Sequence, residues 1–395
     1  MNTFTRKVSR PLVLLVLLLV VVASGCTSRI GTSWAVLGTV EMNGRTQIIV
    51  GYNTVLSLLD PSNGSVTQLE DAEGRTRSDE NGNPRRWLID GGSMEKAEFF
   101  GRPVALDDGI LLFPSINNRL LKVDLLAARI DDPKGIALNN PIITDLVATD
   151  DLIYVPLQFG DVVALDRDTF SEAWRAPVTG GVWSAPVVQD GVMYVAGVNH
   201  FLYAFDATTG QALWAEPVDL GGVAGASPLV TEDAIYIGSF AHKLFKISKE
   251  GQVLATFEGN NWFWSTPVLI DGTLYATDLG GYVYAVNADD MTQVWGVKAA
   301  GRGIRPSPIV SGEYVVAASR DGKVYWLDRA TGEVIKTREI EGHPEILSDM
   351  LLLEPSDTLQ ISEPLIVVGT SDTGKLAVAF PLNPESGYQG WIYSR

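Results

Sequence analysis

The stretch AFDATTGQALW, residues 204–214, decides the fold because weaker copies of it return along the chain. Each copy ends a short run of alternating apolar residues and closes on an Asp or on a residue in its place. The eight closing residues are Asp60, Asp124, Asp166, Asp206, Ser248, Asn287, Asp328 and Phe380. Most intervals are about 41 residues, a period typical of a β-propeller, because one four-stranded blade cannot bury both of its faces alone. We therefore expect an all-β fold, an eight-bladed β-propeller of four-stranded antiparallel blades.

The repeat from Ser184 to Trp214 shows how one copy makes one blade. It holds three alternating apolar runs, each of which predicts a strand, and then an outer strand that we expect to end at Trp214. Turn signals separate the runs at Asp190-Gly191, at residues 197–199 and at residues 206–210. Gly210 supplies the positive φ that closes the third turn.

The first and last repeats are less regular than the middle ones. Inner strands are predicted to start at Trp34, Gln47 and Val55 in the first repeat and at Met350, Pro364 and Lys375 in the last, with Trp391 ending the final outer strand. Seven blades, or a ring in which an end strand completes the opposite terminal blade, are the alternatives. The polar residues 70–86 have no periodicity and predict a long loop between the two outer strands of blade one, with Trp87 resuming the sheet. This loop is either a solvated segment or a partner-recognition flap.

Three tryptophans, Trp174, Trp214 and Trp295, each lie eight residues after the closing residue of their repeat. A large flat side chain on the outermost strand can pack against the next blade, with a contribution of roughly a few kcal/mol. The pattern Ala-x-Asp-x-x-Thr-Gly-x-x-x-Trp of residues 204–214 resembles the tryptophan-docking repeat of the PQQ-like, quinoprotein-type propellers. The predicted blade-closing residues are Asp166, Trp174, Asp206, Gly210, Trp214, Trp295, Asp328 and Gly332.

The first 25 residues read as a signal peptide rather than as part of the fold. Three basic residues precede an apolar run from Leu12 to Ala23, which is too short for a permanent membrane span. Residues 23–26, Ala-Ser-Gly-Cys, resemble the bacterial lipoprotein box, so Cys26 is predicted to carry a lipid; an ordinary secretory cleavage site is the alternative. Because Cys26 is the only cysteine, no intrachain disulfide can form. We expect a signal peptide at 1–25 and a single propeller at 26–395.

Charge and turn residues indicate where partners bind. The formal net charge of −17 makes nucleic acid a poor partner. Segments that precede the inner strands share one end of the ring with the second hairpins and carry aromatic residues and arginines, the types that dominate binding hot spots. The predicted binding face consists of Arg102, Trp183, Trp262, Trp264, Arg302 and Arg305. His200 and His242 lie in second hairpins and are read as surface turn residues, so no metal site is predicted.

The resemblance to quinoprotein propellers raises the question of catalysis. Many of those enzymes hold pyrroloquinoline quinone (PQQ) over calcium with a catalytic Asp and a disulfide between adjacent cysteines, which a single cysteine cannot form. The short repeats also lack large insertions, and no catalytic residue or cofactor is predicted. In length, anchor and repeat the chain resembles the propeller lipoproteins of the outer-membrane β-barrel assembly machinery. This implies a non-catalytic scaffold, lipid-anchored outside the cytoplasm, that binds envelope proteins as a monomeric ring. A PQQ-dependent dehydrogenase and a small-ligand sensor are the alternatives.

Overall fold

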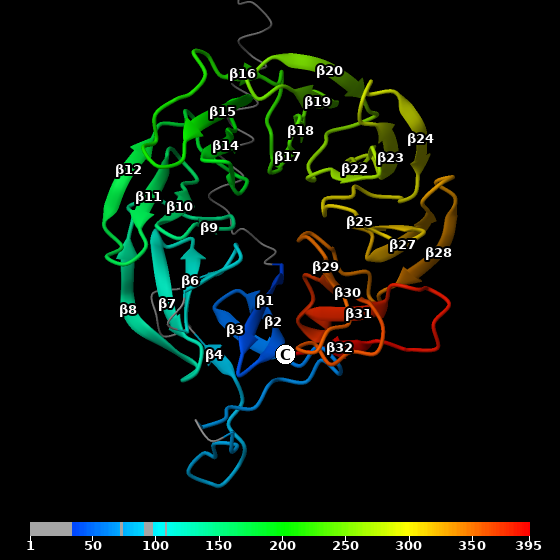
Figure 1. Cartoon of the computed structure of the whole chain (residues 1–395). Helices are drawn as coiled ribbons and strands as arrows, with labels where there is room; N and C mark the ends of the chain where they lie inside the picture. Colours follow the sequence, from blue (N-terminus) through cyan, green and yellow to red (C-terminus); the bar gives the residue numbers. More distant parts are fainter. Residues whose placement is uncertain (1–33, 72–73, 91–97, 107–108) are drawn as a thin grey trace, which may run out of the picture. The chain divides into compact units, whose positions relative to one another are not determined.

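The structure, a computed structural model, describes residues 34–71, 74–90, 98–106 and 109–395. The predicted signal peptide and Cys26 lie outside these residues. In the described part the chain forms eight sheets, each of four strands in which neighbours in sequence pair antiparallel. Figure 1 shows the sheets following one another around a ring in chain order. The prediction of an eight-bladed propeller is confirmed, and the alternative of seven blades is wrong. None of the described residues forms a helix long and apolar enough to cross a bilayer.

The first four blades take residues 36–219. Blade one holds β1 (Val36–Met42), β2 (Arg45–Tyr52), β3 (Val55–Leu59) and β4 (Leu88–Asp90). Blade two holds β5 (Val104–Ala105), β6 (Ile110–Ser115), β7 (Arg119–Asp124) and β8 (Arg129–Ala137). Blade three holds β9 (Val147–Ala148), β10 (Leu152–Pro156), β11 (Val162–Asp166) and β12 (Glu172–Ala176). Blade four holds β13 (Val187–Gln189), β14 (Val192–Ala196), β15 (Phe201–Asp206) and β16 (Val218–Asp219).

The other four blades take residues 229–393. Blade five holds β17 (Leu229–Val230), β18 (Ile235–Gly238), β19 (Lys243–Ile247) and β20 (Val253–Glu258). Blade six holds β21 (Val268–Ile270), β22 (Thr273–Thr277), β23 (Tyr282–Asn287) and β24 (Gln293–Lys298). Blade seven holds β25 (Ile309–Ser311), β26 (Tyr314–Ala318), β27 (Lys323–Asp328) and β28 (Val334–Glu339). Blade eight holds β29 (Leu351–Leu353), β30 (Leu365–Gly369), the 3-10 helix η2 (Thr373–Lys375), β31 (Ala377–Pro381) and β32 (Trp391–Tyr393).

The hydrophobic core is divided among the seams between blades. The buried apolar residues of the described chain form eight clusters, and each cluster draws on two neighbouring blades. Ile49 and Trp87 of blade one, for example, pack with Phe113 and Leu121 of blade two. A blade alone would expose both faces of its sheet, so each blade depends on its two neighbours for burial.

The third turn of a repeat is closed by its Asp and Gly as the sequence predicted. The Asp206 carboxylate accepts hydrogen bonds from the backbone N–H of Thr209 at 2.7 Å and from its hydroxyl at 2.9 Å. These bonds, led by the Thr209 hydroxyl, lower the pKa of Asp206 from its ordinary value. Gly210 follows with a φ of +71°, a conformation that glycine adopts at little cost. Asp328 makes the same bonds to Thr331, at 2.8 Å each.

The tryptophans of the repeats dock onto the next blade, which the sequence also predicted. Trp174 lies over Gly210, Trp214 over Gly251 and Trp295 over Gly332, so close that a Cβ at each glycine would lie 2.5 to 2.8 Å from the indole ring. The prediction that Trp214 ends the outer strand is wrong, because the fourth strand of that blade, β16, begins four residues later. Trp391, likewise, begins β32 rather than ending it.

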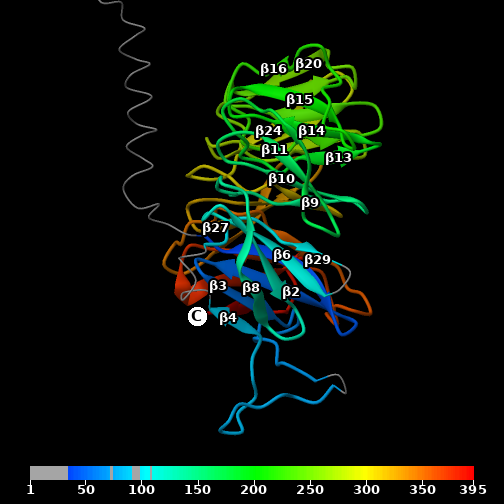
Figure 2. The same ribbon diagram turned by 90° about the vertical axis from the view of Figure 1, so that its left-hand side faces the viewer.

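Residues 60–87 link β3 to β4, and the sequence placed a long loop at residues 70–86 within this link. Figures 1 and 2 show this segment projecting from the ring. Its described part is hydrogen-bonded: the Leu69 N–H donates to the Arg85 carbonyl at 2.8 Å, and the Arg77 N–H donates to the Leu69 carbonyl at 2.7 Å. The segment is therefore a folded arm whose residues 74–86 are exposed.

The ring closes by side-chain packing between blades eight and one. The described ends of the chain stay in separate sheets, so the alternative in which one end strand completes the opposite blade is wrong. The Trp391 indole N–H donates to the Pro61 carbonyl at 2.9 Å, and the indole itself covers Gly64. The hydroxyls of Ser57 and Tyr393 share a buried hydrogen bond of 2.8 Å.

Candidate functional site

A cavity of about 150 Å³ lies where the chain enters the innermost strands, at one end of the ring, and we call it the channel mouth. In seven blades, the residues two and four positions before the innermost strand both line it. Residues two apart in an extended chain point to the same side, which accounts for this pairing. Blade one contributes Trp34, Val36 and Leu37.

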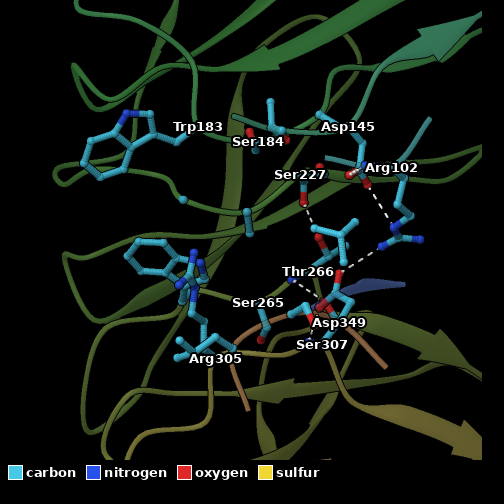
Figure 3. Close-up of a pocket in the computed structure, with 18 of the residues that line it drawn as sticks. Arg102, Asp145, Trp183, Ser184, Ser227, Ser265, Thr266, Arg305, Ser307 and Asp349 are labelled. Atoms are coloured by element: carbon cyan, nitrogen blue, oxygen red, sulfur yellow. Dashed lines mark hydrogen bonds and ion pairs between the residues drawn. The ribbon is translucent and has the colours of Figure 1, made fainter. Parts of the chain in front are cut away.

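The residues two positions before the innermost strands form what we call the polar tier. Its members are Arg102, Asp145, Ala185, Ser227, Thr266, Ser307 and Asp349. The Thr266 hydroxyl donates to the Ser227 carbonyl at 3.0 Å, and the Thr266 N–H donates to the Ser307 hydroxyl at 3.1 Å. The Ser307 N–H in turn donates to the Asp349 carboxylate at 2.7 Å. Figure 3 shows this chain of contacts along one wall of the cavity.

Arg102 continues the polar tier across blade one. Its guanidinium lies 3.4 Å from the Asp349 carboxylate and 3.1 Å from the Asp145 carboxylate, and its backbone N–H donates to Asp145 at 2.7 Å. Burial at the mouth raises the pKa of Asp145 above its ordinary value, against the opposing charge of Arg102. The chain of contacts stops at Ala185, because a methyl group cannot continue a hydrogen-bond network.

The residues four positions before the innermost strands, with Trp34 of blade one, form what we call the aromatic tier. Its members are Trp34, Phe100, Ile143, Trp183, Gly225, Trp264, Arg305 and Leu347. The Arg305 guanidinium lies over the rings of both Trp34 and Trp264, 4.6 Å from each ring centroid. Burial lowers the pKa of Arg305 to about 10, while the charge of Asp349 opposes the shift, so Arg305 stays a cation at neutral pH.

Aromatic side chains continue from this tier to the surface. Trp183 stacks with Trp264 at a centroid distance of 6.4 Å, and Phe240 contacts Trp264 at 5.3 Å and Trp262 at 4.7 Å. Trp262 is 44% exposed. Phe159, in the second hairpin of blade three, is 62% exposed and lies beside the segment that leads to Trp183.

The structure brings four of the six residues of the predicted binding face together. Arg102, Trp183, Trp264 and Arg305 line the cavity. Trp262 reaches the same cluster through Phe240, whereas Arg302 lies outside the cavity lining. The Arg302 guanidinium donates to Glu345 at 2.7 Å, and Arg320 contacts the same carboxylate at 3.0 Å. That these residues bind a partner stays a prediction.

Sequence reasoning missed the acidic members of the site and one exposed aromatic. Asp145 and Asp349 occupy the same position before the innermost strand as Arg102, so the spacing from strand to strand could have found them. Phe159 carries no such signal, because a lone aromatic in a hairpin is common. His200, one of the two histidines that the sequence placed in second hairpins, pairs with Asp219 at 2.8 Å. Among the described residues, no three His, Cys, Asp or Glu side chains come together as a metal site.

Comparison with known proteins gives both a fold and a family. A crystal structure of BamB from Moraxella catarrhalis matches with a TM-score of 0.66 and 14% identity, over 89% of this chain and 96% of that one. At this identity the match shows the fold alone, the eight-bladed ring described above.

Curated relatives match more narrowly. The outer membrane protein assembly factor BamB of Salmonella typhimurium is 29% identical over 148 residues, 37% of this chain and 37% of that protein. The BamB of Alteromonas naphthalenivorans is 26% identical over 251 residues, 50% of this chain and 60% of that protein. The first of these alignments spans little more than a third of the relative. These relatives are named as assembly factors, which agrees with the prediction that this chain is not an enzyme.

A family model matches more of the chain than either relative. The model, described as outer membrane protein assembly factor BamB, covers residues 137–338 and 202–379, which together make up more than half of the chain. The matched region runs from the end of blade two to β31 of blade eight. The chain belongs to the family of the outer membrane protein assembly factor BamB.

Proposed function

We propose that this protein is a non-catalytic scaffold that takes part in outer membrane protein assembly in a bacterial envelope. The family match over residues 137–379 carries the proposal, because its model bears the name of an assembly factor. A closed ring of short blades offers rigid end surfaces on which loops hold side chains in place for a partner.

The docking surface of the proposal is the predicted binding face, Arg102, Trp183, Trp262, Trp264, Arg302 and Arg305, extended by Phe159. Two of its aromatics, Trp262 and Phe159, are 44% and 62% exposed. Exposed aromatics beside arginines supply the apolar area and the charged hydrogen bonds that dominate protein interfaces. Arg302 is also half exposed and therefore accessible to a partner.

The lipid anchor at Cys26 is the second part of the proposal. It rests on the apolar run from Leu12 to Ala23 and on the small residues before Cys26. A single lipidated cysteine would hold the ring at a membrane surface while leaving its end faces accessible. Metabolic labelling with a radioactive fatty acid is expected to label the wild-type protein but not a Cys26→Ser variant, and a wild-type protein without label would contradict the anchor.

The docking surface is tested by chemical cross-linking in intact envelopes. The wild-type protein should cross-link stoichiometrically to a component of the apparatus that assembles outer membrane proteins. A Trp262→Ala, Arg302→Glu double variant should lose that cross-link while keeping its circular dichroism spectrum and melting temperature.

A matched control likewise changes one apolar and one basic residue, but on the outer edge of the ring. Val294→Ala, Lys336→Glu alters one exposed apolar and one charged side chain on β24 and β28. This control should cross-link as the wild type does. Equal cross-linking of both double variants would remove the docking surface, and the absence of any assembly component among the wild-type cross-links would remove the function.

A further inference from the structure

The cavity at the channel mouth holds a cation whose hydrogen-bonding groups are unused. No described residue forms a hydrogen bond or an ion pair with the Arg305 guanidinium, although the other three arginines of this end, Arg102, Arg302 and Arg320, each contact a carboxylate. A guanidinium carries five N–H donors, and Arg305 is only partly exposed, so leaving these donors without partners costs free energy. A ligand that accepts hydrogen bonds from Arg305 would supply the missing partners.

The geometry of Arg305 restricts what that ligand can be. Its guanidinium lies over the rings of Trp34 and Trp264, so its flat faces are engaged. The N–H groups point outward in the plane, and the partner that matches them best is a carboxylate, which accepts two parallel hydrogen bonds. The two indoles also fix the side chain, which lowers the entropy lost on binding.

The carboxylates already present at the mouth leave Arg305 unpaired. One Asp349 oxygen accepts from the Ser307 N–H and the other contacts Arg102. Asp145 is likewise held by the backbone N–H and the guanidinium of Arg102. Arg102 therefore neutralises part of the acidic charge that would repel an incoming anion.

The size of the site favours a small group. The cavity of about 150 Å³ is smaller than the roughly 300 Å³ at which pockets for drug-sized ligands begin. Ser184, whose buried hydroxyl has no partner among the described residues, lines the same cavity and can donate one further hydrogen bond after a rotation. A carboxylate on a short apolar stem would place its charge at Arg305 and its stem along the tryptophans.

We propose that the channel mouth binds a carboxylate group, with Arg305 as the residue that recognises it and Trp34 and Trp264 as the walls that hold it in position. The carboxylate belongs either to a free small acid or to an acidic side chain inserted by a protein. The proposal does not rest on the role in outer membrane protein assembly, and it holds or fails on binding alone.

The experiment titrates the purified full chain in detergent at constant ionic strength, with chloride as the balancing anion. Isothermal titration calorimetry and tryptophan fluorescence follow the binding of acetate, of benzoate and of a Gly-Glu-Gly peptide capped at both ends. Acetamide and capped Gly-Gln-Gly are the neutral controls. Saturable binding of a carboxylate without binding of its neutral control is the expected result. Binding of the free acids alone identifies a small molecule as the source, and binding of the peptide identifies a protein side chain.

Variants at one position decide the role of Arg305. Arg305→Gln should weaken carboxylate binding at least about tenfold, in line with the loss of a charged hydrogen bond. Arg305→Lys keeps the charge but loses the planar arrangement of N–H donors, so its affinity for the carboxylate should lie between those of the wild type and of Arg305→Gln. If Arg305→Gln fails to fold, Arg305→Lys provides the comparison with the wild type. Arg77→Gln, on the arm, should bind as the wild type does. Carboxylate binding unchanged in Arg305→Gln, or no carboxylate binding above the neutral controls, would overturn the proposal.

Discussion

The outer rim of the ring, where the outer strands and third turns of neighbouring blades meet, and the channel mouth are built from the same repeats. They differ in which residue types occupy equivalent positions of those repeats. At the rim, four tryptophans, Trp174, Trp214, Trp295 and Trp391, each cover a glycine with positive φ in the next blade's turn. At the mouth, equivalent positions hold different residues, such as Trp183, Gly225 and Arg305. Four of the eight seams therefore share one contact between tryptophan and glycine, whereas the positions that face the channel mouth differ from blade to blade.

The physical reason lies in what each region must satisfy. A rim tryptophan must fill the space above the next turn, and only a glycine leaves room for its ring. A mouth residue faces a cavity, so its neighbours accept a tryptophan, an arginine or no side chain at all. The variants below test this difference, beginning with the largest expected effect.

The first prediction compares a rim tryptophan with a mouth tryptophan. Trp295→Ala removes a side chain that is 8% exposed and should destabilise the ring by about 3 to 5 kcal/mol. Trp262→Ala removes one that is 44% exposed and should cost about 1 kcal/mol or less. Urea unfolding followed by circular dichroism measures both. An equal loss of unfolding free energy in the two variants would show that the rim tryptophan does not stabilise the ring more than the mouth tryptophan does.

The second prediction isolates the contact between tryptophan and glycine from the backbone conformation. Gly332 and Gly272 have φ values of +75° and +74°, but a Cβ at Gly332 would lie 2.6 Å from the Trp295 ring, whereas one at Gly272 would meet no described atom within 4 Å. Both Ala variants lose roughly 1 to 2 kcal/mol to the left-handed backbone. Gly332→Ala should lose about 1 to 3 kcal/mol more through overpacking. Matching thermal unfolding of the two variants would disprove the docking contact.

The third prediction concerns a competition within the rim. The Tyr154 hydroxyl donates to the Ala207 carbonyl at 3.1 Å, and the Trp174 indole N–H has no partner in the described structure. Trp214 and Trp295 donate instead to the carbonyl at the equivalent place in the next blade, that of Lys249 or Arg329. Tyr154→Phe frees the carbonyl for Trp174 and should be nearly neutral.

A matched variant in blade five lacks this compensation. The Tyr236 hydroxyl donates to the Ala288 carbonyl at 3.2 Å, and Thr256 stands where blades three, four and six have tryptophan. Tyr236→Phe should therefore cost about 1 kcal/mol, the usual net value of one hydrogen bond. Denaturant midpoints of the two variants provide the measurement, and a larger loss for Tyr154→Phe would rule out the competition.

The fourth and smallest effect is a contrast in acidity. Hydrogen bonds lower the pKa of Asp206 at the rim, whereas burial raises that of Asp145 at the mouth, both from 3.8. The stability that Asp206 contributes is complete above pH 3.8 and is lost as the pH falls through its lower folded pKa. Thr209→Val should raise the pKa of Asp206 towards 3.8, because the Thr209 hydroxyl is the main cause of the shift.

Carboxyl carbon NMR titration measures both sites. Thr208→Val is the control, because Thr208 donates only its backbone N–H to Asp206. An Asp206 pKa that Thr209→Val leaves unchanged would assign the shift to the backbone donors alone. An Asp145 that ionises below Asp206 would reverse the proposed contrast between rim and mouth.

The sequence predicted the rim well because its residues repeat. The period, the Asp-to-Gly turn and the tryptophan offset each recur, so Gly210 and Trp295 could be assigned from their copies. Two seams use other devices that the offset could not find: Trp87 donates to the Leu125 carbonyl, and Trp326 donates to the Leu382 carbonyl at 2.8 Å. Their indoles reach the same kind of acceptor from different strand positions.

The mouth was predicted only in part. The residue types indicate what each side chain can bind, but they do not show which side chains contact one another. Trp183 and Arg305 were found as members of one face, yet no sequence pattern shows that Trp34, more than 250 residues from Arg305, lies against it. The contact of Arg102 with Asp349 spans blade one in the same way. Such pairs follow from the closure of the ring, which brings the segments before blades seven and eight close to those before blades one and two.

The closure itself has a consequence for chain topology. Because blades one and eight meet through Trp391, Gly64 and the pair of Ser57 and Tyr393, and share no strand, the order in which the chain visits the blades is not fixed by the ring. Circular permutation should therefore be tolerated. A chain that starts at the exposed turn of Asp271 and Gly272 and joins blade eight to blade one by a short linker would contain the same eight seams and the same mouth.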